Sequence, residues 1–221
     1  MVNIDAPPPL WEPDSTMLLL VDCQPGLSLA AGSRSHQVLV DNVTALVRVA
    51  KVFEVPIVAT TSATQRFSGP VWPTIATLLA GPPIERHLLN AYADDNVRDA
   101  MAKTGRDCVL IAGLLTEACV AFPALSLRAA GRQVAIVADC CAGATVESHD
   151  LALARTSAAG VGLTSWLQVL LEWQQDWTRT ATYGGAIAVL AEFGGAYGLA
   201  LQHARDMLAS PAAHPVALVG P

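Results

Sequence analysis

The chain has 221 residues, of which 52% are hydrophobic and 14% are charged, and its formal net charge at pH 7 is −6. This length is typical of one domain with a well-buried core, and the negative charge argues against a nucleic acid partner, because phosphate binding requires basic patches. So apolar a composition predicts that part of the surface is buried between subunits, in a homo-oligomer.

Residues 1–15 are predicted to form an amino-terminal arm, because three consecutive prolines at 7–9 favour an extended segment. The arm lacks the basic and apolar regions of a signal peptide. The sequence contains no run of 18 apolar residues, so we expect no membrane span. Its five cysteines are an odd number without framework spacing. We therefore expect a reduced, cytoplasmic protein.

Short apolar runs alternate with helical patterns along the chain, which is typical of an α/β fold with a parallel sheet. The first run is almost continuously apolar and indicates a central strand buried on both faces. We predict a doubly wound, mostly parallel six-stranded sheet with helices on both faces. Strands are expected at Thr16–Asp22, Pro56–Thr60, Ile84–His87, Cys108–Gly113, Gln133–Ala138 and Val161–Thr164, and helices at His36–Val52, Thr74–Ala80, Asn90–Lys103, between Gly113 and Gly131, at Ser148–Gly160 and at Ser165–Asp176.

Cys119 lies where the fourth predicted strand passes into its helix. Sites in open α/β sheets form at the carboxyl ends of the strands, and a thiol at the start of a helix is expected to have a lowered pKa. Pro123 cannot donate to the carbonyl of Cys119, so the backbone around the thiol is not a regular helix interior. The alternative is that Cys119 is a small buried apolar residue, as free cysteines usually are.

Two further ionisable residues fall at predicted strand ends. Asp22 ends the first strand, where a buried carboxylate is costly unless it is partnered or catalytic; capping of the following loop is the alternative. Arg86 falls near the carboxyl edge of the third strand, with a surface ion pair as its alternative role. Asp139 is expected to end the fifth strand as Asp22 ends the first.

The rest of the chain predicts no second domain. Residues 184–209 are expected to form one long helix rich in alanine and glycine, which serves oligomerisation or packs on its own domain, and 210–221 form a tail. No glycine-rich phosphate loop follows a strand, so no nucleotide cofactor is expected. Because no CxxC pair is present, we expect no zinc site from the cysteines.

Three segments together resemble the isochorismatase-like cysteine hydrolases: "LLLVDCQPGL" with Asp22, Arg86 ahead of "NAY", and "LIAGLLTEACVAFPALSLRAAG" with Cys119. The resemblance covers residues 16–180 and is strongest to a bacterial subgroup that assembles as octamers. It implies a doubly wound sheet and an Asp–Lys–Cys triad. Asp22 matches the base and Cys119 the nucleophile, while Arg86 occupies the lysine position. That departure matters because arginine is always charged.

The resemblance also implies a cis peptide at Leu115–Thr116, which would aim the backbone N–H groups of Ala118 and Cys119 into an oxyanion hole. Metal-using relatives carry histidines after the second strand, and this chain has none there, so the resemblance implies that it binds no metal. The implied reaction is hydrolysis of a small amide or related carbonyl compound through a thioester. The alternatives are vinyl-ether hydrolysis, as in true isochorismatases, and a non-catalytic scaffold or thiol sensor. We expect the substrate pocket to include Gln24, Phe67 and Trp72.

Overall fold

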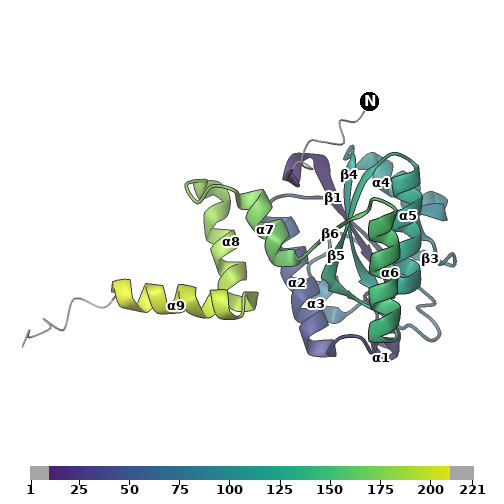
Figure 1. The fold of residues 1–221 in the computed structure, drawn as a ribbon, viewed down its shortest axis with the longest axis horizontal. Coiled ribbons are helices and arrows are strands. Elements are labelled where there is room, and N and C mark those ends of the chain that lie inside the picture. The colour runs from purple at the N-terminus through teal and green to yellow at the C-terminus, as the bar shows by residue number, and fades with distance from the viewer. Residues whose placement is uncertain (1–9, 210–221) are drawn as a thin grey trace, which may run out of the picture.

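The computed structural model describes residues 10–209, and these residues build one parallel sheet with helices on both of its faces (Figure 1). The sheet has six strands in the order β3-β2-β1-β4-β5-β6, and every pair is parallel. The predicted fold class is therefore confirmed. The strands are β1 Thr16–Val21, β2 Ile57–Ser62, β3 Ile84–Arg86, β4 Cys108–Leu114, β5 Gln133–Ala142 and β6 Gly162–Thr164.

Two apolar layers attach the helices to the sheet. Side chains of β1 alternate between them: Leu18 and Leu20 face the layer that holds α2, α3, α7 and α8, while Leu19 faces the layer that holds α4 and α5. This explains why β1 is apolar at every position from Met17 to Val21 rather than at every second one. The helices are α1 Pro25–Ala30, α2 His36–Val52, α3 Pro73–Ala76, α4 Asp95–Lys103, α5 Ala121–Ala129, α6 Val146–Ala158, α7 Trp166–Gln174, α8 Thr180–Phe193 and α9 Ala196–Ala209.

The strand order reverses between β1 and β4, which lie side by side at the centre of the sheet. β1 connects onward to β2 on one side, and β4 connects to β5 on the other. Gly113 permits the close approach of the two central strands, because a Cβ there would collide with the backbone of Val21. In open α/β sheets, ligands bind in the crevice beyond the carboxyl ends of the strands at such a reversal. The fold thus directs attention to the ends of β1 and β4.

Two predicted boundaries are wrong for identifiable reasons. β5 continues to Ala142 instead of ending at Ala138. Asp139 therefore lies inside a strand, and its carboxylate accepts the backbone N–H of Trp166 at 3.0 Å, which caps helix α7. The helix predicted from Asn90 begins at Asp95, because the Asp94 side chain accepts the N–H groups of Asn96 and Val97.

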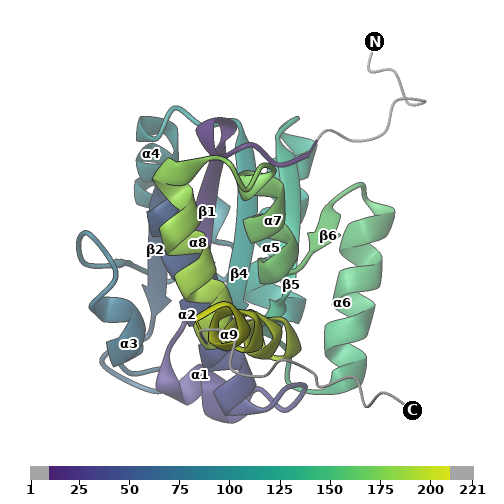
Figure 2. The same cartoon turned by 90° about the vertical axis from the view of Figure 1, so that its left-hand side faces the viewer.

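The predicted single helix over 184–209 is also wrong. It consists of α8 and α9, separated at Gly194 and Gly195, and the two helices are bent by 115°. α8 packs on α2 and buries Ile187 and Leu190, whereas α9 extends away from the sheet (Figures 1 and 2). No single described helix is long and apolar enough to cross a membrane, and α8 and α9 reach that composition only as a bent pair.

Of the predicted arm, the structure describes residues 10–15. They lie against the body of the same chain, where the N–H of Trp11 donates to the Glu172 carboxylate of α7 at 2.8 Å. The predicted tail at 210–221 lies outside the described residues.

Candidate active site

Asp22 lies directly after β1, at the reversal of the strand order, and is fully buried. Its φ of +51° is in the left-handed region, which aspartate tolerates better than most residues. Thr60 Oγ1 donates to one carboxylate oxygen at 3.0 Å, and Ser62 Oγ donates to the other at 3.1 Å. Both hydroxyls come from β2, the neighbouring strand, so the sheet itself orients this carboxylate.

Arg86 is the last residue of β3, and only 1% of its surface is exposed. Its Nη2 donates to Asp22 Oδ2, and its Nη1 donates to the carbonyls of Leu88 and Leu89. Its Nε–H points to Thr60 Oγ1 at 3.4 Å. Arg86 is therefore part of a buried ion pair and not of a surface pair.

Cys119 lies in a π-helical turn, Thr116–Val120, which we call the nucleophile turn; it joins the end of β4 to α5. The Cys119 thiol lies close enough to the Asp22 carboxylate and the Arg86 guanidinium for both to act on its pKa, and it is 6% exposed. Residues from three strand ends, Asp22, Arg86 and Cys119, thus meet in one buried cluster. π-Helical turns are rare and are often found at functional sites.

The pKa of the Cys119 thiol is raised, not lowered as its place before a helix suggested. Burial is the main cause, the charge of Asp22 adds to it, and Arg86 partly opposes both. Burial also raises the pKa of Asp22, against the lowering effects of Arg86, Thr60 and Ser62. The resting pair is consequently a thiol beside a carboxylate of increased basicity.

The backbone of the nucleophile turn differs from the expectation in two respects. The cis peptide joins Leu114 to Leu115, one bond earlier than predicted. The N–H of Ala118 donates to the Leu115 carbonyl at 3.2 Å, and the same carbonyl accepts the N–H of Val120. An oxyanion-binding role for Ala118 would require that first bond to be given up, so the oxyanion hole stays a prediction.

The three predicted pocket residues have different surroundings. Gln24 is fully buried, and its amide group bonds to the backbone of Ser62 and Gly69, so it fastens the loop after β2. The Trp72 side chain is also buried and donates to Ser28 Oγ at 3.0 Å. Phe67 is 67% exposed on the loop after β2. Of the three, only Phe67 presents its side chain to solvent.

Sequence reasoning missed the hydroxyls of Thr60 and Ser62 and the imidazole of His149. The signal for the first two was present, because the polar "TTS" ends an otherwise apolar strand. Nothing in the sequence around His149 distinguishes it. His149 meets the nucleophile turn only through the packing of α6 against that turn, where its Nδ1 lies 2.8 Å from Thr116 Oγ1.

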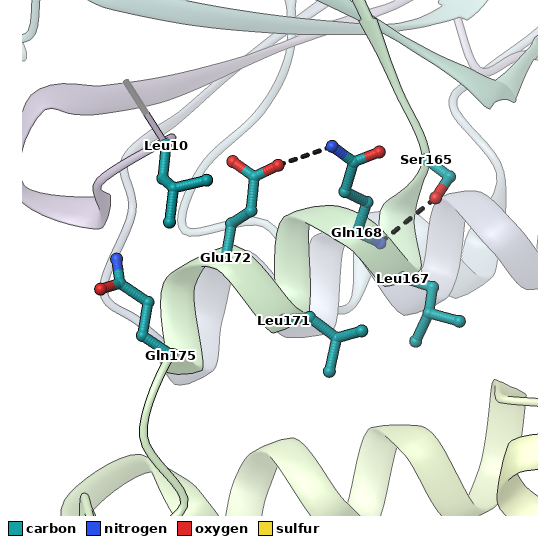
Figure 3. Close-up of a pocket in the computed structure, with 7 residues that line it drawn as sticks. All are labelled: Leu10, Ser165, Leu167, Gln168, Leu171, Glu172 and Gln175. Carbon is teal, nitrogen blue, oxygen red and sulfur yellow. Dashed lines mark hydrogen bonds between the residues drawn. The ribbon is translucent and has the colours of Figure 1, made fainter. Parts of the chain in front are cut away.

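A broad surface hollow of about 600 Å³ lies elsewhere, along α7 (Figure 3). Leu10, Leu171 and Glu172 are among its lining residues, and none of the lining residues belongs to the Asp22–Arg86–Cys119 cluster. Within residues 10–209, no group of three or more histidine, cysteine, aspartate or glutamate residues is arranged to hold a metal ion. The buried cluster is therefore the stronger candidate for chemistry.

Comparison with known proteins agrees with this fold. The isochorismatase domain model matches residues 16–168. The chain is 34% identical over 162 residues to "Probable hydrolase YcaC" of Escherichia coli (strain K12), which covers 72% of this chain and 78% of that protein. The crystal structure of the Escherichia coli YcaC gene product, described as an octameric hydrolase of unknown specificity, superposes with a TM-score of 0.86 at 31% identity, covering 92% of this chain and 99% of that one.

A second solved structure, YcaC from Pseudomonas aeruginosa with hexane-2,5-diol and covalent acrylamide, gives a TM-score of 0.84 at 30% identity and covers 89% of this chain and 97% of that one. The family model alone spans more than half of the sequence. This chain therefore belongs to the isochorismatase family, as a hydrolase similar to YcaC.

Proposed function

We propose that the protein is a cysteine hydrolase that cleaves a small, uncharged amide through a thioester on Cys119. The observation that carries the proposal is the buried cluster in which the Cys119 thiol meets the Asp22 carboxylate and the Arg86 guanidinium. A nucleophile, a base and a group that orients the base are the parts that covalent acyl transfer requires.

The first half of the reaction forms the thioester. Asp22 accepts the proton of Cys119 as the sulfur attacks the carbonyl carbon, and the carbonyl π electrons move onto oxygen. When the tetrahedral intermediate collapses, the C–N bond breaks and the amine leaves with the proton that Asp22 returns. In the second half, Asp22 takes a proton from water, the hydroxide oxygen attacks the thioester, and the carboxylic acid and the free thiol result.

The raised pKa values of both groups suit this sequence of steps. A resting thiol is not permanently ionised, and a buried carboxylate is a stronger base than an exposed one. Arg86 keeps the carboxylate charged and oriented, but it cannot itself shuttle a proton. Asp22 is therefore the only group of the cluster that moves protons.

The substrate is expected to be uncharged because the Arg86 guanidinium is already occupied by Asp22 and by the carbonyls of Leu88 and Leu89. An anionic substrate would need a cation that is free to bind it. Large apolar side chains are exposed on the loops and the short helix that follow β1, β2 and β3, namely Leu29, Phe67, Leu88 and Leu89. These exposed apolar side chains favour an uncharged substrate over an anionic one.

The YcaC relatives add two supporting observations. The Pseudomonas aeruginosa protein was crystallised with covalent acrylamide, an electrophile that adds to thiols, which supports a reactive nucleophile in this fold and not a substrate class. The Escherichia coli protein is octameric, and we propose that this chain is also a homo-oligomer. The high apolar content supports that assembly.

The test is rapid-quench intact-mass spectrometry of the full-length protein with a panel of small uncharged amides. At least one amide is expected to give a transient acyl adduct that maps to Cys119 and decays with release of the acid. Cys119→Ala should give no adduct, whereas the matched control Cys108→Ala, which removes a buried strand thiol outside the cluster, should retain it. Turnover that persists in Cys119→Ala would refute the covalent mechanism, and a reactive thiol without turnover would favour the scaffold or sensor.

A further inference from the structure

The two polar residues that precede Cys119 in the nucleophile turn contact helix α6 and its preceding loop. Thr116 Oγ1 and His149 Nδ1 are hydrogen-bonded at 2.8 Å. Thr116 is 0% exposed and His149 is 7% exposed. A hydrogen bond between two buried side chains is costly to lose, because either partner alone would be left unsatisfied. This bond joins the turn to the first helical turn of α6.

Glu117 makes a second connection between the same elements. Its Oε1 accepts the N–H of Ala144, in the loop before α6, at 2.9 Å. Its Oε2 is buried, with no hydrogen-bond partner among the described residues. A Cβ added to Gly143 would lie 2.5 Å from that oxygen and 3.1 Å from the backbone nitrogen of His149. Glycine at 143 is thus what leaves room for the carboxylate beside the amino-terminal end of α6, where the helix dipole favours negative charge.

The backbone bonds of the nucleophile turn are local. The N–H groups of Ala118 and Val120 converge on the carbonyl of Leu115, each at 3.2 Å, and the N–H of Ala121 bonds to the carbonyls of Thr116 and Ala118. These local bonds fix the shape of the turn, and bonds to other elements fix where the turn, and with it the Cys119 sulfur, lies relative to Asp22. Thr116 and Glu117 supply such bonds, and neither is a partner of the Asp22–Arg86 pair.

We propose that Thr116, Glu117 and His149 are positioning residues, which hold the nucleophile turn against α6 and thereby keep the Cys119 thiol beside Asp22 and Arg86. The inference rests on the proposed function and extends it to residues that do not touch the reacting atoms. We call the Thr116–His149 and Glu117–Ala144 contacts the α6 clamp.

The surroundings of His149 are compatible with this role. Arg34, on the loop between α1 and α2, and Asp150 and Glu117 are the charged groups that act on its ring. Burial and Arg34 lower the pKa of His149, against Asp150 and Glu117. Arg34 is itself held by the carbonyls of Ala138 and Cys141. The imidazole is accordingly neutral at neutral pH. Its Nδ1 can then form one hydrogen bond with the Thr116 hydroxyl, in a direction that depends on the tautomer.

The test follows acrylamide addition to Cys119 by peptide mass spectrometry across pH, in the full-length protein. Thr116→Val and His149→Phe each remove the bond. Each is expected to lower the pH midpoint of Cys119 labelling by about one unit, toward that of an ordinary thiol, because the sulfur leaves the buried carboxylate. The double variant should shift no further, since both changes remove one interaction. Thr116→Ser and His149→Asn keep the polar atoms and should restore the wild-type midpoint.

Thr156→Val is the matched control, because it removes another buried hydroxyl of α6 whose Oγ1 donates to Ala152 O at 2.9 Å. It should leave the midpoint unchanged. Gly143→Ala adds a methyl group that displaces the Glu117 carboxylate without changing a residue of the turn, and it should shift the midpoint in the same direction. This variant provides the test if Thr116→Val or His149→Phe does not fold. The α6 clamp is refuted if Thr116→Val and His149→Phe keep the wild-type midpoint. It is also refuted if the conservative variants and the Thr156→Val control shift the midpoint as far as Thr116→Val and His149→Phe do.

The same measurement separates this inference from the proposed function. If wild-type Cys119 takes up no acrylamide at any pH, the reactive thiol is missing and the proposed function fails, together with the inference that rests on it. If wild-type Cys119 is labelled and turns over an amide while the clamp variants keep its midpoint, only the positioning role is refuted.

Discussion

Arg86 donates from Nη2 to Asp22 Oδ2, and both side chains are fully excluded from solvent. The family resemblance implies lysine at this position, and the structure explains how arginine is accommodated. Its guanidinium reaches the carboxylate through one nitrogen and the carbonyls of Leu88 and Leu89 through another. A lysine carries one compact ammonium group and does not offer the same planar set of donors.

Removing the cation is expected to destabilise the fold. Arg86→Met leaves the buried Asp22 carboxylate without its partner, which costs about 3–5 kcal/mol in the free energy of unfolding. Arg86→Lys keeps the charge and should lose less stability, while retaining part of the amide turnover. Urea unfolding of the three proteins, with the amide assay beside it, checks both statements. Equal stability of Arg86→Met and wild type would mean that the pair contributes nothing to the fold.

Asp22→Asn should separate thiol reactivity from catalysis. The negative charge of Asp22 raises the pKa of Cys119, so its removal should lower that pKa and increase the thiolate fraction near neutral pH. Alkylation of Cys119 by iodoacetamide should then be faster at pH 8, whereas amide hydrolysis should be lost because the base is absent. Peptide mapping against pH gives the midpoint. A midpoint at or above that of the wild type would contradict the electrostatic argument.

Cys119→Ala should abolish turnover with little effect on the fold. The side chain is small, and its replacement by a methyl group removes only one sulfur atom from the core. The change should therefore cost about 1 kcal/mol in the free energy of unfolding. Thermal unfolding and the amide assay on the same sample separate the two effects. A large loss of stability would indicate that the thiol is mainly a packing residue, which is the alternative that its burial leaves open.

Two truncations distinguish the roles of α8 and α9. Ending the chain after Gly194 removes α9, which projects from the body (Figure 1), and should change the oligomeric state while the subunit stays folded. Ending it after Arg179 also removes α8, whose Ile187 and Leu190 are buried in the core. That second change should lower the melting temperature, because several apolar side chains lose their cover. Size-exclusion chromatography and thermal unfolding report the two effects, and an unchanged assembly without α9 would show that it is not an interface.

The sequence anticipated some elements more closely than others. Helix α2 matches its predicted bounds, His36–Val52, because a long amphipathic pattern is a local signal. The extension of β5 through Asp139 to Ala142 was missed, since a carboxylate inside a strand is explained only by its contact with the N–H of Trp166 on α7. The bend at Gly194 and Gly195 was missed as well, because glycine pairs weaken a helix without specifying an angle.

The candidate site shows the same division. Continuous apolar runs that end in Asp22 and lead to Cys119 are local patterns, and with the family resemblance they were enough to single out Asp22, Cys119 and Arg86, which the structure brings together. The hydroxyls of Thr60 and Ser62 and the imidazole of His149 were not named. Their roles depend on which strand or helix lies alongside, and side-chain periodicity does not carry that information.

The sequence by itself determined the α/β class and most of the order of the strands and helices, because burial on both faces of a parallel sheet requires apolar runs that can be read one segment at a time. Only the tertiary structure decided that β1 lies beside β4, that the pKa of Cys119 is raised, and that α6 contacts the nucleophile turn. The physical reason is that strand pairing, desolvation and the contacts of a buried side chain depend on segments that are distant in the chain and meet only when it folds.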